Sequence, residues 1–333
     1  DGRVTGATVK VNGTHRAETS KRGVVLAAGD YANNASMIAE YKGRQFAAVE
    51  GINSDATGDG HRLVASVGGE LRNMSITYGP EFRFVPPPRR PFSQLLPSNR
   101  AAVKLMGAVL PVVPKFLINA FIKRLLVTWQ HPEDALLDDG AILVNKHGRR
   151  FCDELDSPDR EIAVANQPDK TAYILLDETI ISRYSQWPHF ISTAPEIAYA
   201  YVDDYLRLRP DVAIAAGSLE QLAAGRNLPT AELVGAAAGT RQIENVPHMK
   251  RPLQGSRWVL LGPIKSYFTT TEGGAAIDTS FRVLDHNGEA IRGLYAIGQN
   301  GLGGQILWGH GLHIAWAMTS GRLVGKVLAE SDL

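Results

Sequence analysis

The pattern of apolar and polar positions near the C-terminus predicts a strand, a loop and a helix in close succession. Residues 294–298 form a short apolar run that ends at a glycine, which is typical of a buried strand. Five glycines follow between residues 301 and 311, and this density favours a loop pressed against a ligand, because a Cβ would obstruct close approach. From there the apolar positions recur at helical spacing, on a face of Leu312, Ala315, Trp316, Thr319, Leu323 and Val327.

The start of this predicted helix contains no acidic residue. Its free N–H groups and the positive end of its dipole therefore face whatever occupies the glycine loop. The order of strand, glycine loop and helix start indicates a binding site for an electron-rich or anionic group. A tight strand–helix connection without any ligand is the alternative.

The first 70 residues also alternate between strand and helix signals. Residues 1–31 predict a short β-meander with a hairpin turn at Asn12-Gly13 and a buried strand at Val24–Leu26. Asp30 is expected to cap a helix over residues 33–41.

Two further helix starts carry residues that commonly cap helices. Asp59 is expected to cap a helix over residues 61–67, and Ser218 with Gln221 fits a capping box. Together with the strands, these helices predict a mixed α and β protein.

The middle of the chain predicts several more strands. Residues 142–145 and 149–151 are expected to be strands joined by a turn, and residues 173–177 another strand. Cys152 is expected to be a buried, inert thiol in the second of these strands. As the single cysteine, it rules out an internal disulfide and any cysteine-built metal site.

Residues 101–128 form a largely apolar segment with basic residues spaced along it and prolines at 111 and 114. The segment is too interrupted for a membrane-spanning helix, which needs about 20 apolar residues without charges. Two interpretations stay open. It is either a basic amphipathic hairpin that lies on a membrane surface, or a lid or oligomer contact over the active site.

Composition and charge exclude one class of partner. The 333 residues are 44% hydrophobic and 21% charged, which is ordinary for a soluble globular protein of two domains. The formal net charge is +1, so the chain offers no basic field for nucleic acid.

Five segments in order resemble the fumarate reductase/succinate dehydrogenase flavoprotein superfamily, which includes the 3-ketosteroid dehydrogenases. They are Gly23–Tyr31 (GVVLAAGDY), Ala56–Gly60 (ATGDG), Ile142–Asn145 with Gly148–Phe151 and Glu154, Thr271–Gly274 with Asp278, and Gly293–Ala329. The resemblance implies FAD as the cofactor. It also implies an α/β (α+β mixed) fold: an incomplete Rossmann-like FAD-binding domain with an inserted α+β substrate-capping domain.

The same resemblance divides the chain into three parts. Residues 1–71 and 256–333 would belong to the FAD-binding domain, and residues 72–255 to the capping domain. The GxGxxG turn with which the family binds the ADP half of FAD is not found in the sequence. A missing N-terminal segment, or an oligomer partner in its place, is therefore expected. The expected location is cytoplasmic or at a membrane surface through residues 101–128.

The resemblance also implies roles for particular residues. FAD would be contacted by Ala28, Gly29, Asp59, Gln299, Gly311, His313 and Ile314. Substrate would be contacted by Leu307, Trp308 and Gly309.

The family moves a hydride between flavin N5 and a carbon next to a carbonyl or carboxylate. An arginine and a histidine that hold the dicarboxylate in fumarate reductases fall here on Trp308 and Thr270, so a dicarboxylate substrate is disfavoured. The catalytic tyrosine of the ketosteroid dehydrogenases falls on Leu307, and a second tyrosine falls near Pro158. A neutral, apolar, steroid-like small molecule is the expected substrate.

Four residues are candidates for the proton chemistry. Tyr267 and His310 are titratable groups near the glycine loop, and Glu154 and Arg160 could pair in the capping domain, catalytically or as a plain salt bridge. The alternatives are a fumarate reductase-like enzyme that acts on a carboxylate, and a non-catalytic flavin-domain fragment or partner subunit. The density of glycines favours an enzyme, although the chain alone is expected to be inactive.

Overall fold

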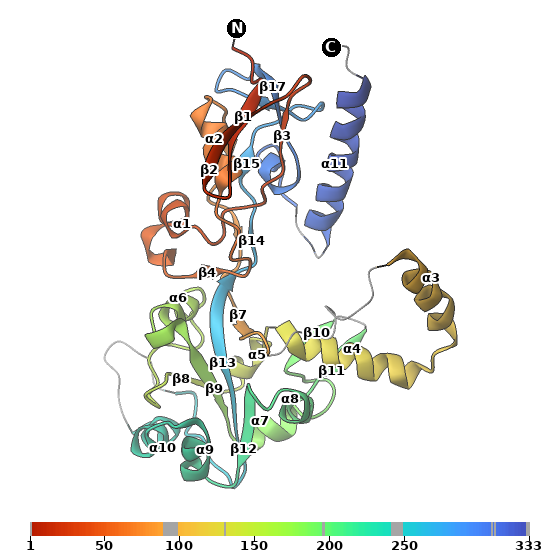
Figure 1. Ribbon diagram of the computed structural model, residues 1–333. Coiled ribbons are helices and arrows are strands. Elements are labelled where there is room, and N and C mark those ends of the chain that lie inside the picture. The colour runs from red at the N-terminus through yellow and green to blue at the C-terminus, as the bar shows by residue number, and fades with distance from the viewer. Residues whose placement is uncertain are drawn as a thin grey trace. The chain divides into compact units, whose positions relative to one another are not determined.

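The computed structural model of the chain describes residues 2–88, 99–129, 131–194, 197–240, 249–307, 309 and 311–330. It divides into two compact units (Figure 1). The first unit combines Asp1–Pro80 with Tyr267–Leu333, and the second unit is Glu81–Ser266. The sequence analysis places the corresponding limits at 71 and 255.

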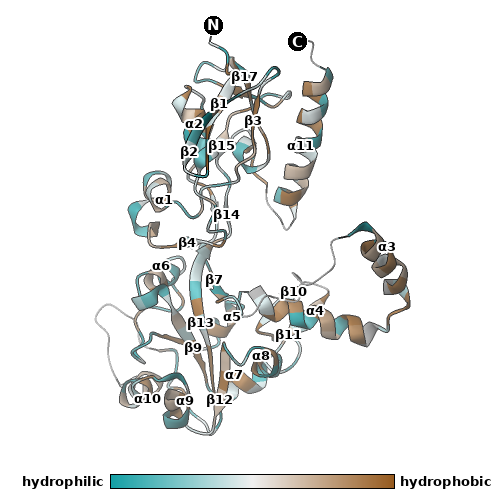
Figure 2. Cartoon of the chain, in the orientation of Figure 1, coloured by the Kyte–Doolittle hydropathy of each residue, from teal (hydrophilic) through white to brown (hydrophobic). Residues whose placement is uncertain are grey.

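The second unit is built on an antiparallel sheet with neighbours in the order β12-β13-β9-β8, and β7 also pairs with β13. Its strands are β7 (Glu81–Phe84), β8 (Ile142–Val144), β9 (Ala172–Leu176), β12 (Ala213–Ala216) and β13 (Trp258–Phe268), whose last two residues belong to the first unit. Leu143, Leu175 and Leu260 are completely buried on neighbouring strands, which explains the apolar runs seen in the sequence (Figure 2).

Helices surround this sheet, beside a small separate hairpin. They are α5 (Ala135–Asp138), α6 (Asp159–Ala165), α7 (Glu178–Arg183), α8 (Val202–Leu208), α9 (Leu219–Arg226) and α10 (Thr230–Ala238), and the hairpin is β10 (Ser192–Ala194) with β11 (Ala198–Ala200). Ser218 caps α9 by accepting the Gln221 N–H, as predicted. The Gln221 side chain accepts the Gly217 N–H, so the reciprocal half of the expected capping box is absent.

The strand expected at residues 149–151 is wrong. Only one isolated bridge joins Arg150 to Val144. The Asn145 side chain accepts the N–H groups of His147 and Arg149, which closes a tight turn, and Arg150 turns to form an ion pair with Glu154. Cys152 is buried but lies in a bend, and burial raises the pKa of its thiol.

The largely apolar segment expected at residues 101–128 forms two helices. They are α3 (Arg100–Val109) and α4 (Lys115–Trp129), separated by the short 3-10 helix η3 (Leu110–Val112). The end of α4 is buried at Leu126 and Val127, which join the core of the second unit. Of the helices in the described part of the chain, none is sufficiently long and apolar to cross a membrane.

The first unit contains a three-stranded sheet in the order β16-β17-β3. Here β3 (Val24–Leu26) runs parallel to β17 (Ala290–Ala296), and β16 (Arg282–Leu284) is antiparallel to β17. Leu26, Leu294 and Ala296 are buried, so the two strands predicted from the apolar runs are confirmed.

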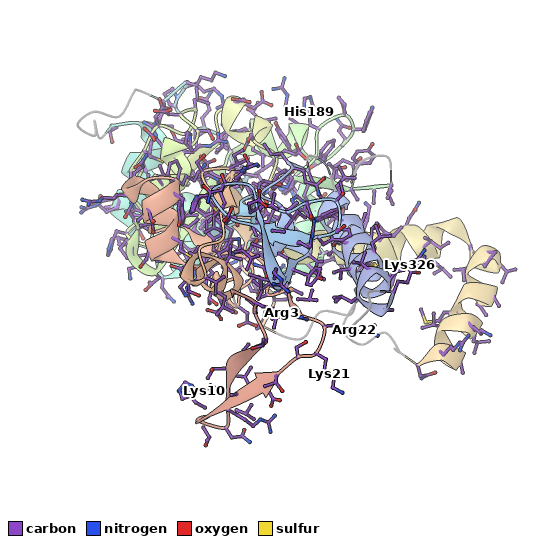
Figure 3. All side chains as sticks on the ribbon, turned by 90° about the horizontal axis from the view of Figure 1, so that it is seen from above. Arg3, Lys10, Lys21, Arg22, His189 and Lys326 are labelled. Atoms are coloured by element: carbon purple, nitrogen blue, oxygen red, sulfur yellow. The ribbon has the colours of Figure 1, made fainter. Side chains whose placement is uncertain are left out.

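A hairpin of β1 (Gly6–Val11) and β2 (Thr14–Thr19) precedes this sheet. Asn12 and Gly13 both have positive φ, as the predicted turn requires. Every residue of β2 is exposed, and Lys10 lies near the tip of the hairpin (Figure 3).

Three short strand pairs organise the remainder of the first unit. They join β4 (Glu50–Gly51) to the end of β13, β5 (Leu71–Arg72) to β15 (Gly274–Ala275), and β6 (Thr77–Tyr78) to β14 (Thr270–Thr271). These pairs hold residues 267–275 against the first 80 residues of the chain.

Both aspartates expected to cap helices in the first unit do something else. Helix α1 (Ala35–Tyr41) is capped by Asn34, whose side chain accepts the Met37 N–H, and Asp30 points elsewhere. Helix α2 (Asp59–Ser66) begins after Gly58, at a φ of 75°, without a side-chain cap. Asp59 lies inside the first turn, where it forms an exposed ion pair with Arg62.

The predicted C-terminal helix is confirmed as α11 (Leu312–Glu330), but its buried face is rotated from the expected one. Ser320 and Val324 are its buried residues, whereas the expected Leu312 and Leu323 are each more than 40% exposed. Hydrogen bonds explain the difference, because the Ser320 hydroxyl accepts the Gly298 N–H at 3.0 Å. Apolar spacing alone does not reveal a polar contact of this kind.

Asp177 gives a test of what stabilises the second unit. Its fully buried carboxylate caps α7 at Ile180 and accepts hydrogen bonds from Arg251 and the Gln254 N–H. Burial alone would raise its pKa, but these hydrogen bonds outweigh burial and hold the pKa below its usual value.

We expect Asp177→Asn to lower the free energy of unfolding by about 2–3 kcal/mol near neutral pH, because Arg251 loses a buried anionic partner. A carboxyl with a lowered folded pKa stabilises the fold above its unfolded pKa, about 3.9, and loses this effect as pH falls through the folded pKa. The difference between wild type and variant in urea unfolding should therefore shrink below about pH 4. Asp203→Asn, at an exposed ion pair with Arg257, is the control and should change stability by less than about 0.5 kcal/mol. Equal losses in both variants would contradict the argument.

Candidate active site

The site is built around the turn that follows β3. Asp30 in this turn is 5% exposed, and its carboxylate accepts hydrogen bonds from the Ala32 N–H, the Thr271 N–H and the Thr270 hydroxyl at 2.6–3.1 Å. The Gln299 side-chain amide donates a fourth at 3.1 Å. Asp30 therefore joins the end of β3 to β14 and to the 3-10 helix η5 (Gly298–Gly301).

Asn300 makes a second connection between the same segments. Its side chain accepts the Ala28 N–H at 2.5 Å and donates to the Gly29 carbonyl at 2.9 Å. The backbone of the 28–29 turn is thereby fixed beside η5. Gly29 has a φ of 76°, a conformation that L side chains rarely adopt.

His61 of α2 packs beneath this turn. Its ring is 1% exposed, and its Nε2 lies 3.0 Å from the Gly273 carbonyl, so this nitrogen carries the proton and donates. Nδ1 is then the acceptor for the Asn300 amide at 3.4 Å. Burial is the main cause that lowers the pKa of His61. The neutral ring is a structural support for the site.

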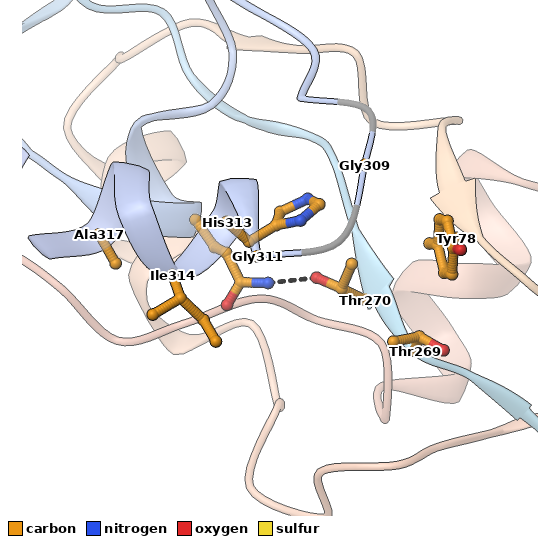
Figure 4. Close-up of a pocket in the computed structure, with 9 residues that line it drawn as sticks. Tyr78, Thr269, Thr270, Gly309, Gly311, His313, Ile314 and Ala317 are labelled. Atoms are coloured by element: carbon orange, nitrogen blue, oxygen red, sulfur yellow. Dashed lines mark hydrogen bonds between the residues drawn. The ribbon is translucent and has the colours of Figure 1, made fainter. Parts of the chain in front are cut away.

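A cavity of about 360 Å³ opens between the start of α11 and β14. It is lined by Tyr78, Thr269, Thr270, Gln299, Gly309, Gly311, His313, Ile314 and Ala317. Figure 4 shows His313 and Ile314 on the helix side of the cavity and Thr269 and Thr270 on the strand side. The size is within the usual range of small-molecule and cofactor sites.

His313 in the first turn of α11 is bonded to an acidic residue that the sequence analysis does not identify as functional. Its Nε2 lies 2.7 Å from Oε1 of Glu272, which is 1% exposed. The other oxygen of Glu272 accepts the Leu307 N–H at 3.3 Å. The signal that could have revealed this pair is an acidic residue among the small, buried residues 270–276. The pairing itself depends on contacts between segments 41 residues apart.

The residues around the cavity have the chemistry that a flavin ring would need. Gly309 and Gly311 both have positive φ and line the cavity with backbone alone. The Leu312 and Ala315 N–H groups donate to the Gly309 and Gly311 carbonyls, and the first turn of α11 contains no acidic residue, so the positive end of its dipole is at the cavity. Ile314 and Met318, exposed by 69% and 74%, offer an apolar surface for a ring beside them.

Four of the five glycines between residues 301 and 311 divide into two groups according to what surrounds them. A Cβ at Gly301 would lie 2.6 Å from the Ala296 carbonyl oxygen, and one at Gly303 would collide with the Gly274 carbonyl. These two glycines are required for backbone packing. Gly309 and Gly311 line the cavity, so they are the members of the run that can serve a ligand.

Most of the residues expected to bind the cofactor come together in the structure. Gln299, Gly311, His313 and Ile314 line the cavity with the expected substrate residue Gly309.

The remaining expected residues lie in different surroundings. Ala28 and Gly29 are bonded to Asn300 behind the cavity, and Leu307 is bonded to Glu272. Asp59 is exposed and does not line the cavity. Trp308 and His310 lie outside the described residues.

The other catalytic candidates do not line this cavity. Tyr267 pairs with Glu50 of β4, and burial, with the nearby Glu50 carboxylate, raises the pKa of its phenol to about 12. Glu154 and Arg160 belong to the second unit.

The expected ion pair between Glu154 and Arg160 is wrong. The Glu154 carboxylate pairs with Arg150 at 2.5 Å. The Arg160 guanidinium pairs with Glu161 and Asp134 and reaches Glu154 only at its backbone carbonyl. Glu154 and Arg160 each have a different partner, so each takes part in its own structural ion pair in the second unit.

Comparison with known proteins identifies the family. The profile of the FAD binding domain family matches residues 1–90 and 124–305. A fumarate reductase of Schizosaccharomyces pombe is 24% identical over 318 residues, which cover 93% of this chain and 53% of that protein. The chain spans about half the length of the curated relatives it matches.

Solved structures show the same fold. The open conformation of a flavocytochrome c3 fumarate reductase aligns over 99% of this chain and 50% of its own, with a TM-score of 0.62 and 22% identity. The 3-ketosteroid Δ1-dehydrogenase of Sterolibacterium denitrificans, solved with 1,4-androstadiene-3,17-dione, aligns over 99% of this chain and 57% of its own, with a TM-score of 0.52 and 21% identity.

These findings confirm the resemblance found in five sequence segments and the mixed helix-and-sheet fold. The finer division into a Rossmann-like domain and a capping domain stays a prediction. The chain belongs to the FAD binding domain family, with FAD as its cofactor, among oxidoreductases whose relatives include fumarate reductases and 3-ketosteroid dehydrogenases.

Proposed function

We propose that the protein is an FAD-dependent oxidoreductase that acts on a C–C bond next to a carbonyl, in a neutral and largely apolar substrate. FAD, when bound, supplies the hydride and electron chemistry. The observation that carries the proposal is the cavity at the start of α11, where Gly309 and Gly311 line the wall beside the His313–Glu272 pair. The first unit is then the flavin-binding part and the second unit the substrate-capping part.

The residues that would hold FAD are those that the structure fixes most firmly. The backbone of Ala28 and Gly29 is locked by Asn300, and the Gln299 amide is held by Asp30 and Thr270. The N–H groups at the start of α11 favour an electron-rich ring edge. A polar wall whose side chains are already in place costs little reorganisation when a ligand binds.

The His313–Glu272 pair is suited to proton transfer. Nε2 of His313 is bonded to the buried carboxylate, which fixes the ring and leaves Nδ1 as the nitrogen that can exchange a proton with substrate. Glu272 acts through His313 and is therefore a positioning residue. The pair is a further candidate for proton transfer beside Tyr267 and His310. It is favoured over Tyr267 because His313 lines the cavity whereas Tyr267 does not.

The cavity lining supports a neutral substrate. None of the described lining residues is Lys or Arg, and Thr270 stands where the resemblance to fumarate reductases would place a histidine. A dicarboxylate would need cationic partners there, since carboxylates are held most strongly by charge-assisted hydrogen bonds. The similarity to a fumarate reductase of S. pombe keeps carboxylate reduction as the second candidate.

The substrate class can be tested with the full-length protein, loaded with FAD. We expect kcat/KM for a 3-ketosteroid, measured with an artificial electron acceptor, to exceed kcat/KM for fumarate, measured with a reduced dye, by about 100-fold or more. The physical reason is that the carboxylates of fumarate would lose their hydration without gaining cationic partners. Efficient fumarate reduction with no turnover of the ketosteroid would favour the second candidate and overturn the first. A purified protein without flavin absorbance in any preparation would contradict the FAD-dependent chemistry itself.

The proton-transfer pair gives a separate prediction. We expect His313→Gln to lower kcat by about 10²- to 10⁴-fold, because an amide cannot exchange a proton near neutral pH. Glu272→Gln should lower kcat by about 10-fold or more and change its pH profile, since the ring loses its anionic hydrogen-bond partner.

The control is His15→Gln on the exposed strand β2, which should leave kcat and its pH profile unchanged. The amount of flavin bound per chain, read from its absorbance, should stay the same in all three variants. If both active-site variants merely lose flavin in parallel with activity, the pair has a structural role and the assignment is wrong.

A further inference from the structure

Helix α3 of the second unit has very little covered surface. Every residue from Arg100 to Val109 is exposed except Ala102, which is half-buried. In Figure 1, α3 lies with η3 and the start of α4 apart from the sheet of the second unit. A ten-residue helix is marginal in water without tertiary contacts, so α3 requires a partner that covers it.

The exposed side chains of this segment are large and apolar. Val103, Leu105, Met106 and Val109 in α3 are exposed by 43–67%, and Val112 in η3 by 78%. The same stretch is strongly apolar in Figure 2. A contiguous apolar surface of this kind on a water-facing protein marks an interaction site.

The polar side of α3 is basic. At 100° per residue, Leu105, Met106 and Val109 lie opposite Arg100 and Lys104. The helix therefore has an apolar face and a narrow cationic face. This combination is typical of helices that lie in the interface of a membrane.

The wider segment has the same charge. No Asp or Glu occurs between Glu81 and Glu133, whereas the whole chain has a net charge of +1. Lys123 is already bonded to Asp204, so its charge is not included among those that could attract an external partner. Arg100, Lys104 and Arg124 are exposed cations.

These charges distinguish between two possible partners for the surface of α3, a second copy of the chain and a lipid bilayer. A second copy packed on the apolar face would leave Arg100 and Lys104 on the far side without anionic partners, so it would account for only one face of α3. A bilayer with anionic headgroups offers an apolar interior and negative charge in one surface. An anionic lipid surface therefore fits both faces of α3.

We propose that α3, η3 and the beginning of α4, residues 100–117, form a docking surface for anionic membranes. Leu105, Met106, Val109 and Val112 enter the boundary between headgroups and acyl chains, and Arg100 and Lys104 lie at the level of the phosphates. This inference does not depend on the proposed function.

The test uses the 333-residue chain and sedimentation with vesicles. Binding should be measured with phosphatidylcholine vesicles and with vesicles that contain about 30% phosphatidylserine. Each basic residue near an anionic surface contributes roughly fivefold in partitioning, so we expect at least about 10-fold stronger binding to the anionic vesicles at low salt. This preference should decrease at high ionic strength, where surface charges are screened.

Two variants separate the contributions of the two faces. Leu105→Gln with Met106→Gln should lower binding to both kinds of vesicle by about 10-fold or more, since apolar burial contributes in either case. Arg100→Gln with Lys104→Gln should remove most of the preference for anionic vesicles. Glutamine is a good helix former, so neither change removes the helix.

The matched controls lie in the first unit. Leu63→Gln changes an exposed apolar residue of α2, and Lys10→Gln with Arg16→Gln changes exposed cations of the β1–β2 hairpin. Controls that lose binding as strongly as the α3 variants would overturn the proposal. So would wild-type chain that binds neither vesicle. Light scattering that shows a dimer, abolished by the Leu105/Met106 variant, together with absent vesicle binding, would assign the surface to a second copy instead.

Discussion

The buried carboxylate of Asp30 is the interaction on which the geometry of the site depends. An ionised carboxylate inside a protein is strongly unfavourable unless hydrogen bonds replace its hydration. Four donors from three separate segments do so here, and each donor therefore has its position set by the same group. Two of them, Thr270 and Gln299, belong to the wall of the cavity. The polar side of the cavity is thus fixed from behind by a residue that does not line it.

Local patterns predicted several of the elements but not these connections. The apolar runs of β3 and β17, the turn at Asn12-Gly13 and the long C-terminal helix follow from residues that are neighbours in sequence. The sequence also predicted that the glycine loop and the helix start lie together. It failed for Asp30, because an aspartate shortly before a helix resembles a cap, and only the tertiary fold shows that β14 and η5 supply donors to it.

The same limit explains why the Glu272–His313 pair was not predicted and why the size of the binding loop was overestimated. Glu272 and His313 are far apart in sequence, so their bond could not be read from either local pattern. Glycine density was treated as one signal, yet Gly301 and Gly303 serve close packing of backbone against backbone. Gly309 and Gly311 alone carry the argument for a ligand. A run of glycines therefore overstates the size of a binding loop unless the packing of each one is known.

Two exposed apolar surfaces in the chain have different chemistry, and this difference separates their roles. The surface of α11 at Ile314 and Met318 adjoins a cavity with polar walls and a paired histidine, which suits a planar cofactor ring that needs both contacts. None of the residues that line this cavity belongs to α3, and the cations of α3 lie opposite its apolar side chains. A ring cofactor needs directed hydrogen bonds, whereas a lipid surface needs only apolar depth and positive charge. The distribution of polar groups around each apolar surface, rather than the apolar area itself, therefore identifies the kind of partner that it fits.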